Sequence, residues 1–546
     1  MRLLRTVGHL RANQIAALVS NRVRGALENP SLLLSGAVPA YPGCRWRPAN
    51  PFLLPAQFTP ADSILAGNLK FLNQTIATGW PPDWNFHAVS RLWLYNLHYF
   101  DWIWTLDYPS ALTAAVNWID QHPPARGATG WEPYPTSLRL MNWCGFFWHK
   151  HGNTLVNDTT ARDKLWQSQH RQLEWLESHL EKHLSGNHVL ENAAALTVAG
   201  CCFDGADARR WYDRGVDLLE EQIAEQFLAD GGHYERSPMY HSRAMYVLLL
   251  LSSLGDPAVS QLVRAPLDRG IEALKCMTHP DGRIALLNDS AWGVYNAPQE
   301  LSRAVGASWP PGAEVFSLPQ SGYYGARTED GSYIICDAGP IGPDHQPGHA
   351  HGDTLSFELS LRGHRVIVDS GVFDYEPGAM REYCRSTRAH NTIEVDGQDQ
   401  SEFWGTFRVG RRARAQAWHT RTDDGFELRG VHDGYRNLRH ERHFKWSNPG
   451  VLELKDTLAH AGRRRFVSRL HLHPDCRVTE QSASAASVAY AAGSFVVQFV
   501  GQGQLSFEQT CFCPEFGKQI PNRTIAWAGE AVGTTQVVCT ISPGVS

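Results

Sequence analysis

The sequence lacks long apolar runs, which excludes two features of membrane and exported proteins. No stretch of about 18 consecutive apolar residues occurs in the 546 residues, and a bilayer-crossing helix needs about that many. Near the N-terminus the longest apolar run is residues 15–19, which is too short for a signal-peptide core. We therefore predict no membrane span and no cleavable export signal, and we expect a cytoplasmic protein, with the cell envelope or periplasm as the alternative.

An excess of positive charge is also lacking. The chain has 50 Lys and Arg against 55 Asp and Glu, a formal net charge of −5. A general nucleic-acid binder carries a basic footprint, so we exclude nucleic acid as a partner and expect any anionic ligand to be held by a local site. With 43% apolar and 19% charged residues, the composition is that of a globular protein.

Cysteine motifs are absent as well. The eleven Cys include the close pairs Cys201/Cys202 and Cys511/Cys513, but no spacing of a zinc ribbon or a redox motif. We expect most of them to be buried small hydrophobic residues.

Arginine gathers at the start of the chain. Residues 1–30 contain Arg2, Arg5, Arg11, Arg22 and Arg24, and we treat them as a basic N-terminal arm. We expect a helix packed on the body of the protein. The alternative is an amphipathic helix in peripheral contact with an anionic membrane surface.

Aromatic rings and imidazoles are abundant, with 19 Trp, 17 Tyr, 22 Phe and 25 His. Rings at this density fill a large core, and in sugar-active proteins they also stack against pyranose rings. We expect core packing for most, and consider Trp131, Tyr134, Trp143 and Trp404 as platforms for sugar rings.

Residues 31–312 are predicted to form a helical domain. Apolar residues recur at helical spacing in two stripes, Leu173/Leu176/Leu180/Leu184 and Val216/Leu219/Ile223/Phe227, each opposite a charged face. Short Gly-rich and Pro-rich loops separate the helices. This pattern indicates an α/α architecture, either a solenoid or a closed toroid of helical hairpins.

Residues 313–546 are predicted to form an antiparallel β-sandwich. After the Trp-Pro-Pro-Gly segment at 309–312 the pattern changes to alternation, as in residues 356–361, which are followed by Arg362-Gly363 and the run 365–368. This is a strand, a tight turn and a strand. Further strands are predicted at 451–454, 494–500 and 535–541.

Three imidazoles and a carboxylate surround this predicted hairpin. On a strand His349 and His351 point to the same face, and Asp369 and His390 follow nearby. Zinc binds nitrogen and oxygen ligands in a tetrahedral arrangement, so His351, Asp369 and His390 leave one position for a fourth ligand or water. The alternative is that these are buried histidines satisfied by hydrogen bonds.

Two loops of the helical half carry Asn, Tyr and His, at residues 186–188 and 236–241. Such residues are commonly helix caps or turn formers. Together they also suit β-elimination from a uronate. An amide or imidazolium neutralises the carboxylate as charge flows into it, a base removes the neighbouring proton, and an acid protonates the leaving oxygen.

Five motifs together resemble the heparinase II/III family of polysaccharide lyases. They are residues 186–192 (GNHVLEN), 235–241 (ERSPMYH), 348–359 (GHAHGDTLSFEL), 368–371 (VDSG) and 385–392 (RSTRAHNT). The resemblance runs from about residue 90 to the end. It implies an incomplete (α/α) toroid joined to an antiparallel β-sandwich, with a cleft for acidic, glycosaminoglycan-like chains.

The resemblance also implies roles for individual residues. Asn187 would neutralise the uronate carboxylate with His188 beside it, Tyr240 would be the general base or acid, and His349 its partner. His351, Asp369 and His390 would match the family's metal site, which is more structural than catalytic, and we expect a divalent ion, zinc, there. We also expect four residues to contact the substrate, namely His98, Arg236, His241 and Arg388.

Substrate binding needs cations, because Arg forks pair with carboxylate or sulphate. Five Arg lie in or near the motifs, namely Arg139, Arg236, Arg243, Arg385 and Arg388. We expect about half of them to be structural, paired with acids such as Glu235 and Glu382.

The start of the chain departs from the secreted members of the family, which begin with an export signal. The chain looks similar to heparinase-like proteins associated with bacterial exopolysaccharide production. Two other functions remain open. One is a hydrolase with two carboxylates about 5 to 9 Å apart, drawn from Glu132, Glu191 and Glu235. The other is a non-catalytic polysaccharide-binding or assembly protein.

Overall fold

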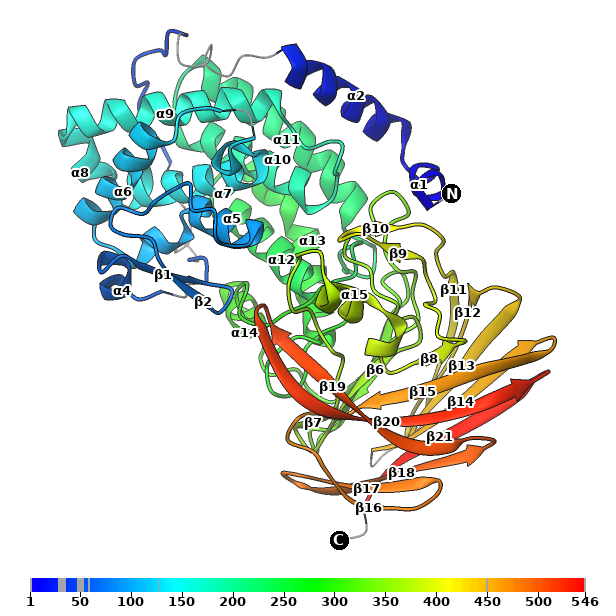
Figure 1. Cartoon of the computed structure of the whole chain (residues 1–546). Coiled ribbons are helices and arrows are strands. Elements are labelled where there is room, and N and C mark those ends of the chain that lie inside the picture. Colours follow the sequence, from blue (N-terminus) through cyan, green and yellow to red (C-terminus); the bar gives the residue numbers. More distant parts are fainter. Residues whose placement is uncertain are drawn as a thin grey trace. The chain divides into compact units, whose positions relative to one another are not determined.

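The computed structural model describes residues 2–27, 36–46, 54–56, 59–125, 127–447 and 450–544, so residues 28–30 of the predicted arm lie outside them. A helical N-terminal part is followed by antiparallel sheets (Figure 1). The chain divides into two compact units, which we call the helical unit (Leu10–Gln226 and Ala244–Leu267) and the β unit (Met1–His9, Phe227–Arg243 and Asp268–Ser546).

The helical unit contains most of the helices. These are α2 (Ala12–Leu27), α4 (Ala61–Leu65), α5 (Arg91–Tyr99), η1 (Asp101–Thr105), α6 (Tyr108–Gln121), η2 (Thr129–Trp131), α7 (Pro133–Trp143), η3 (Cys144–Lys150), α8 (Gly152–Asn157), α9 (Thr159–Ser178), α10 (Asn187–Cys202) and α11 (Ala206–Gln226). A short hairpin, β1 (Asn68–Phe71) and β2 (Gln74–Ala77), interrupts them. Within the described residues, no helix combines the length and the apolar character needed to cross a membrane.

Side-chain caps explain where several of these helices begin. Asp107 accepts the backbone N–H of Ser110 at the start of α6, and Asp158 accepts that of Ala161 at the start of α9. Both bonds satisfy a donor that has no partner within the helix. A proline in the first turn of α6 adds to this signal, because its missing N–H costs nothing there.

One predicted apolar stripe extends past the end of its helix. Leu173 and Leu176 lie in α9, but the helix ends at Ser178, before Leu180 and Leu184. The backbone N–H of Glu181 donates to the side chain of Asn192 at 3.0 Å rather than to a helical carbonyl. This distant partner stops the helix where the apolar spacing alone predicts that it continues.

The β unit contains three larger sheets with antiparallel pairing. The five-stranded sheet is β3 (Glu314–Leu318), β4 (Tyr323–Arg327), β5 (Tyr333–Asp337), β6 (Phe357–Leu361) and β7 (His364–Ile367). The four-stranded sheet has the order β19 (Gln504–Glu515), β20 (Lys518–Val532), β15 (Arg463–His471) and β8 (Ile393–Val395).

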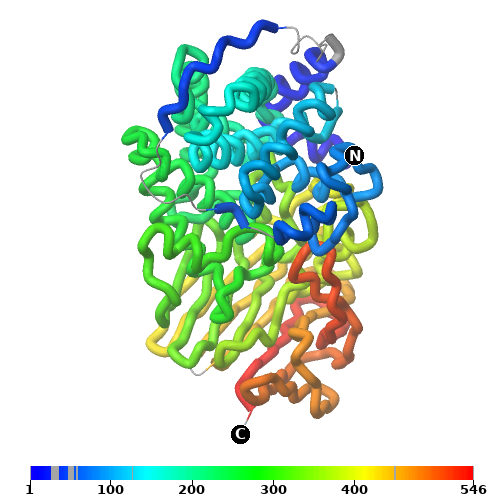
Figure 2. Tube along the Cα trace, turned by 90° about the vertical axis from the view of Figure 1, so that its left-hand side faces the viewer, coloured from blue at the N-terminus to red at the C-terminus, as the bar shows by residue number. Residues whose placement is uncertain are grey.

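The eight-stranded sheet has the order β11 (Ala415–Thr422), β12 (Gly425–Tyr435), β13 (Leu438–Ser447), β14 (Val451–His460), β21 (Thr535–Pro543), β18 (Gly493–Gly501), β17 (Ala485–Tyr490) and β16 (Arg477–Gln481). A small pair, β9 (Phe403–Trp404) and β10 (Arg408–Val409), completes the strands of the unit. Figure 2 shows this part of the trace, yellow to red, running back and forth as long strands.

The β unit also contains short helices, namely α1 (Arg2–Val7), α14 (Pro298–Ala304), α15 (Ala379–Arg385) and η4 (Thr387–Ala389), of which α15 and η4 lie between β7 and β8. Two further helices, α12 (Pro238–Ser252) and α13 (Pro257–Cys276), have residues in both units. The 309–312 segment lies between the end of α14 and the start of β3.

The predicted hairpin is confirmed as β6 and β7. Arg362 and Gly363 connect them with φ of 48° and 83°, which is the pair of positive values that a two-residue I′ turn requires. The strands predicted at 451–454, 494–500 and 535–541 lie within β14, β18 and β21.

Residues from all three larger sheets share one apolar core. Phe357 of β6, Phe444 of β13 and Trp527 of β20 belong to the same buried cluster. The prediction for the cysteines is confirmed, since Cys44 is half-buried and the other ten are buried.

Candidate active site

Tyr240 is placed by the loop that precedes α12. Ser237 caps this helix by accepting the backbone N–H of Tyr240 at 3.2 Å, and its hydroxyl donates to the carbonyl of Asp289 at 2.6 Å. Pro238 is the first helical residue, a position that proline favours. The Ser-Pro pair of the motif therefore fixes Tyr240 in the first turn and ties it to the loop of Asp289.

Tyr240 and His349 lie against one another. Their ring centroids are 3.9 Å apart with an interplanar angle of 28°, and the hydroxyl of Tyr240 is 3.1 Å from that of Tyr375. Burial, together with the neighbouring Tyr375 and Tyr295, raises the pKa of Tyr240 well above its ordinary value. Tyr240 is therefore a neutral phenol that has a proton to give.

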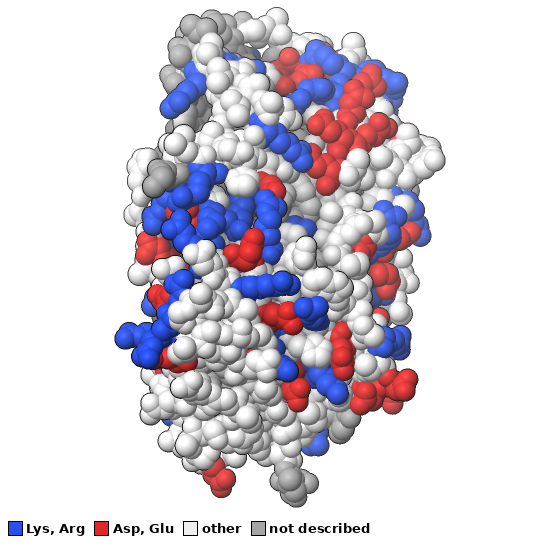
Figure 3. All heavy atoms as spheres, turned by 90° about the vertical axis from the view of Figure 1, so that its right-hand side faces the viewer, with Lys and Arg blue, Asp and Glu red and all other residues white. Residues whose placement is uncertain are grey.

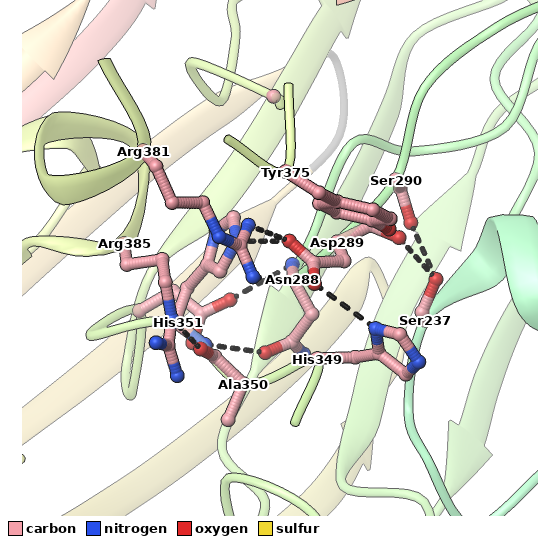
Figure 4. A network of polar contacts seen from close by, with 12 residues as sticks. Ser237, Asn288, Asp289, Ser290, His349, Ala350, His351, Tyr375, Arg381 and Arg385 are labelled. Carbon is pink, nitrogen blue, oxygen red and sulfur yellow. Dashed lines mark hydrogen bonds and ion pairs between the residues drawn. The ribbon is translucent and has the colours of Figure 1, made fainter. Parts of the chain in front are cut away.

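His349 lies between two carboxylates. Its Nδ1 is 3.0 Å from Oδ2 of Asp289 (Figure 4), and its Nε2 is 3.5 Å from Oε2 of Glu235. Residues 348–352 form part of the loop between β5 and β6, so the strand considered for His349 and His351 is not present. The loop turns the two rings to opposite oxygens of Asp289 instead.

Asp289 and Arg381 form a buried ion pair behind His349. The guanidinium contacts both carboxylate oxygens, with Nη2 to Oδ2 at 2.9 Å. Burial favours a raised pKa for Asp289, but the charge of Arg381 and the hydrogen bonds from His349, His351 and Arg381 hold it well below its ordinary value. Asp289 is therefore ionised despite being completely buried.

The predicted metal ligands come together in the same unit. His351, Asp369 and His390 are buried, and each offers one ligand atom within 4.8 Å of the others. Nδ1 of His390 lies 2.7 Å from Oδ2 of Asp369. Burial favours a lowered pKa for His390, but the Asp369 carboxylate outweighs it and raises the value to about 9.

The remaining atoms of this cluster fit a metal ion. Among the described residues, Nδ1 of His351 and Nε2 of His390 are buried without a hydrogen-bond partner, as is Oδ1 of Asp353. Buried polar atoms normally have partners. Two imidazole nitrogens and a carboxylate form a donor set that suits zinc.

Asn187 and His188 belong to the helical unit and begin α10. Ser185 and Gly186 precede them with φ of 62° and 65°, and the carbonyl of Gly186 accepts the side chain of Gln226 at 2.8 Å. The ring of His188 packs against Tyr134 with centroids 4.5 Å apart and an interplanar angle of 44°, and its Nδ1 is 3.1 Å from Oε1 of Glu181. The Gly-Asn-His motif thus forms a constrained helix start.

His98, predicted as a substrate contact, is a core residue. It is completely buried in α5, and its Nδ1 accepts the indole N–H of Trp118 at 3.1 Å. Burial, together with His122 and Arg139, lowers the pKa of His98 well below its ordinary value. The prediction for His98 is corrected because a buried, neutral ring has no surface for a polysaccharide.

His241 is also structural. Nδ1 accepts the backbone N–H of His233 at 3.2 Å, and Nε2 donates to the carbonyl of Gly270 at 2.8 Å. Only 1% of the residue is exposed. Both nitrogens are used inside the β unit, so we withdraw the predicted substrate contact.

The candidate cations differ in their freedom to bind an anion. Arg388 is exposed, whereas Arg139 is completely buried against Trp118. The guanidinium of Arg385 donates to the carbonyls of Ala350, Gly405 and Thr406. These contacts make Arg139 and Arg385 structural and leave Arg388 as a cation at the surface.

Arg236 and Arg243 are engaged within the β unit. Arg236 donates to the carbonyls of Tyr234, Gln320 and Ser321. Nη1 and Nη2 each have a second N–H, so the predicted substrate contact of Arg236 stays a prediction. Arg243 is buried, with its guanidinium 5.7 Å from the centre of the Tyr295 ring.

Core packing, the expected role of most rings, is confirmed for Trp131, Tyr134 and Trp143, which are at most 5% exposed. Trp404 is half-buried, and its indole N–H donates to Thr6 at 3.0 Å.

The carboxylates considered for hydrolysis lie in different places. Glu132 accepts hydrogen bonds from Arg91 and Tyr95. Glu191 is buried in α10, and Glu235 lies beside His349.

The sequence analysis missed Asp289, Arg381 and Tyr375. One available signal for Asp289 was the polar Asn-Asp-Ser triplet that directly follows the apolar run 284–287. Arg381 and Tyr375 carry no comparable signal, because each acts through a contact with a residue distant in sequence.

Comparisons with known proteins show the family and the fold. The family model described as heparinase II/III N-terminus matches residues 98–305, and the one described as heparinase II/III-like, C-terminal matches residues 310–540. The crystal structure of heparinase III has a TM-score of 0.71 at 18% identity, covering 85% of this chain and 79% of that one. The structure of a mutant heparan sulfate lyase from Pedobacter heparinus has a TM-score of 0.64 at 19% identity and covers 98% of this chain and 88% of that one.

Curated relatives match over shorter spans. The heparin-sulfate lyase of Pedobacter heparinus is 27% identical over 305 residues, 50% of this chain and 44% of that protein. The heparin-sulfate lyase of Bacteroides thetaiotaomicron is 23% identical over 404 residues, which are 62% of this chain and 54% of that protein. The chain spans about half the length of the curated relatives it matches. Because the two family models together cover most of the chain, it belongs to the heparinase II/III family.

Proposed function

We propose that this protein is a polysaccharide lyase that cleaves an acidic, uronate-containing polysaccharide by β-elimination. The observation that carries the proposal is the stacked pair of Tyr240 and His349, with the ionised Asp289 behind the imidazole. Such a pair supplies an acid and a base side by side, which a protein that only binds polysaccharide does not need.

The hydrogen bond to Asp289 divides the roles within this pair. A carboxylate accepts and does not donate, so Nδ1 of His349, 3.0 Å from Asp289, carries hydrogen. Nε2 lies 3.5 Å from Oε2 of Glu235, longer than a normal N–H···O hydrogen bond, and is assigned to take the proton beside the uronate carboxylate. Tyr240 then protonates the leaving glycosidic oxygen, because burial keeps its phenol protonated. Asn187 and His188 are assigned to the uronate carboxylate, where an amide or imidazolium stabilises the charge that flows into it.

The substrate class follows from the relatives. Those described above are heparin-sulfate lyases, which supports a glycosaminoglycan-like polymer. A bacterial exopolysaccharide containing uronate is the second candidate. On the face drawn in Figure 3 basic and acidic side chains are interspersed, so a local cation such as Arg388, rather than a uniform basic surface, is proposed to attract the polymer.

Two finer features of the fold accompany this proposal. We assign the helices to an incomplete (α/α) toroid and the sheets to an antiparallel β-sandwich. The apolar core shared by the sheets of the β unit supports the second assignment, because sandwich sheets pack face to face over one core.

The metal assignment is part of the same proposal. His351, Asp369 and His390 would hold a zinc ion, which would stabilise the loops of the β unit as a structural ion. No step of the elimination is assigned to it.

The test is a screen against heparosan, heparin, chondroitin, hyaluronan and alginate, with two readouts. New ultraviolet absorbance from an unsaturated uronate identifies a lyase, and new reducing ends without that absorbance identify a hydrolase. An unchanged chain length for a polymer that binds identifies a binding protein. We expect absorbance with at least one polymer, and its absence with all of them contradicts the lyase assignment.

Tyr240→Phe is predicted to lower kcat by at least about 100-fold, since general acid catalysis is typically worth that much. The matched control is Tyr333→Phe, which removes a buried hydroxyl that donates to the carbonyl of Cys276 at 2.6 Å in the same unit. Initial rates of absorbance increase measure both variants. Equal rates for the two variants would remove Tyr240 from the mechanism.

A peripheral membrane contact is proposed for α2. Ile15, Leu18, Val19 and Val23 recur at helical spacing and are 42–59% exposed, and residues 1–27 contain no Asp or Glu. An apolar face combined with basic residues suits an anionic bilayer surface.

This contact predicts co-sedimentation with vesicles that contain phosphatidylglycerol and little with pure phosphatidylcholine. The double variant Val19→Glu/Val23→Glu should lose binding by about tenfold or more, because two charges then oppose both the apolar and the electrostatic attraction. Val500→Glu, at a site that is 62% exposed in β18, is the control. Equal sedimentation of both variants would refute the contact.

A further inference from the structure

Asp289 is a buried carboxylate whose two oxygens serve two different histidines. Oδ2 accepts from Nδ1 of His349 at 3.0 Å, and Oδ1 accepts from Nε2 of His351 at 2.9 Å. The fork of Arg381 contacts both oxygens from another side, as Figure 4 shows. His349 is the proposed base, and His351 is a candidate metal ligand.

These bonds determine which nitrogen of each ring carries hydrogen. An ionised carboxylate only accepts, so both nitrogens that face Asp289 must be protonated. His349 therefore presents Nε2 away from Asp289, on the side of Glu235 at 3.5 Å, and His351 presents Nδ1. Nδ1 of His351 is one of the buried atoms that have no hydrogen-bond partner among the described residues, as expected for a nitrogen that faces an ion.

The surrounding contacts hold Asp289 in this position. Its backbone N–H donates to the carbonyl of His349 at 3.0 Å, and the side chain of Asn288 accepts the backbone N–H of His351 at 3.0 Å. Nε of Arg381 donates to the carbonyl of Thr406 at 3.0 Å. The loop that carries both histidines therefore holds Asp289 in place, and Arg381 links the carboxylate to the segment that contains Thr406.

We propose that Asp289 is a positioning residue that sets the tautomer and orientation of His349 and His351 together, so that the metal site and the proton-transfer site share one carboxylate. The part of this inference that concerns catalysis rests on the proposed function. A hydrogen-bond acceptor behind a metal-ligating histidine fixes the orientation and the tautomer of its ring. Here Asp289 would do so for His351 and, through its other oxygen, for His349 as well.

The test compares Asp289→Asn with Asp456→Asn. Asp456 is a matched control because it is also a buried carboxylate of the β unit that accepts from an Arg and a His, with Nε2 of His440 at 2.7 Å and Nε of Arg442 at 2.7 Å. These partners of Asp456 differ from His349 and His351, the two histidines that Asp289 contacts. Both variants remove one buried charge from an Arg-Asp-His group.

Three quantities are measured on the full chain. The first is the protonated nitrogen of His349, from two-bond ¹H–¹⁵N spectra of protein labelled with ¹⁵N-histidine, with the signals assigned from His349→Gln. The second is zinc affinity, by competition with a chromogenic chelator. The third is kcat and KM with the polymer that the wild type cleaves.

Asp289→Asn is expected to shift hydrogen from Nδ1 to Nε2 of His349, because an amide can turn its N–H toward the ring. Zinc affinity should fall about 10- to 100-fold. A fall in kcat of at least about 100-fold with KM within about threefold is expected from a wrongly protonated base. Asp456→Asn should leave all three quantities unchanged, even if it lowers the unfolding midpoint.

Unchanged tautomer and zinc affinity in Asp289→Asn would overturn the inference, as would equal losses in Asp456→Asn. If the wild type gives no unsaturated product, the proposed function fails, and the spectra and the zinc affinity still decide the role of Asp289. Arg381→Lys is the second variant should Asp289→Asn not fold. It keeps a cation but cannot contact both oxygens, so smaller changes in the same directions are expected, and none would count against the inference.

Discussion

At the scale of single residues, the site depends on which nitrogen or oxygen faces which partner. The ionised Asp289 fixes one nitrogen of His349, and the phenol of Tyr240 stays protonated beside it. In the proposed metal site, Asp369 contacts Nδ1 of His390, so Nε2 is the ring nitrogen that would bind an ion. These assignments follow from hydrogen bonding.

The metal assignment gives a prediction at this scale. Dialysis against a chelator should lower the melting temperature, since an ion that binds only the native state adds about 2.7 kcal/mol when free metal is about 100 times Kd. Affinity should rise from pH 7 toward 9, because the ion displaces the proton that the raised pKa of His390, about 9, retains. Scanning calorimetry with and without zinc measures both effects.

The control for the metal prediction is a pair of histidine variants. His390→Gln should make melting insensitive to the chelator, whereas His440→Gln, which removes a buried imidazole paired with Asp456, should not. A chelator that leaves the wild type unchanged, together with no zinc by elemental analysis, would exclude the site.

At the scale of elements, local patterns predicted strands and turns well where all the information is local. The β6–β7 turn places Arg362 and Gly363 at positive φ, and an exposed Arg is a poor choice there. Arg362→Asn is predicted to raise the free energy of unfolding by about 0.5–1 kcal/mol, because Asn adopts this conformation more readily. Urea unfolding measures the change, and Arg362→Val should lower stability, since a β-branched residue resists positive φ. A Val variant as stable as the Asn variant would contradict this account.

Patterns failed where a distant side chain decides the local structure. The end of α9 is set by Asn192, and the region around His349 is a loop because Asn288 and Asp289 bind it. For the same reason the sequence motifs singled out Tyr240, His349 and the three proposed metal ligands, whose roles stay predictions, but not Asp289 or Arg381. Residue types with distinctive chemistry can be recognised in a motif, whereas the polar triplet that contains Asp289 marks only the end of an apolar run, and the role of Asp289 follows from its contacts.

At the scale of the whole molecule, buried neutral histidines link stability to pH. Burial lowers the pKa of His122, His241 and His279 to about 4, below the ordinary value of about 6.5 in the unfolded chain. Between these values the unfolded state binds more protons, so stability is complete above pH 6.5 and is lost as the pH falls toward 4. Each histidine contributes about 3 kcal/mol to this loss.

Urea midpoints at pH 7, 5.5 and 4 measure the effect, and they should fall steadily. His279→Gln should lower the midpoint at pH 7 but flatten its dependence on pH, because Gln does not titrate. A midpoint that is independent of pH in the wild type would contradict the assignment of these rings as neutral.

The central claim is that the chain breaks a polysaccharide by elimination. The most direct measurement is mass spectrometry of the products formed from a uronate polymer in water labelled with heavy oxygen. The account predicts products that lack one water relative to hydrolysis products and contain no heavy oxygen, formed by the wild type and by Tyr333→Phe but hardly by Tyr240→Phe. Products that carry heavy oxygen would identify a hydrolase and contradict the account.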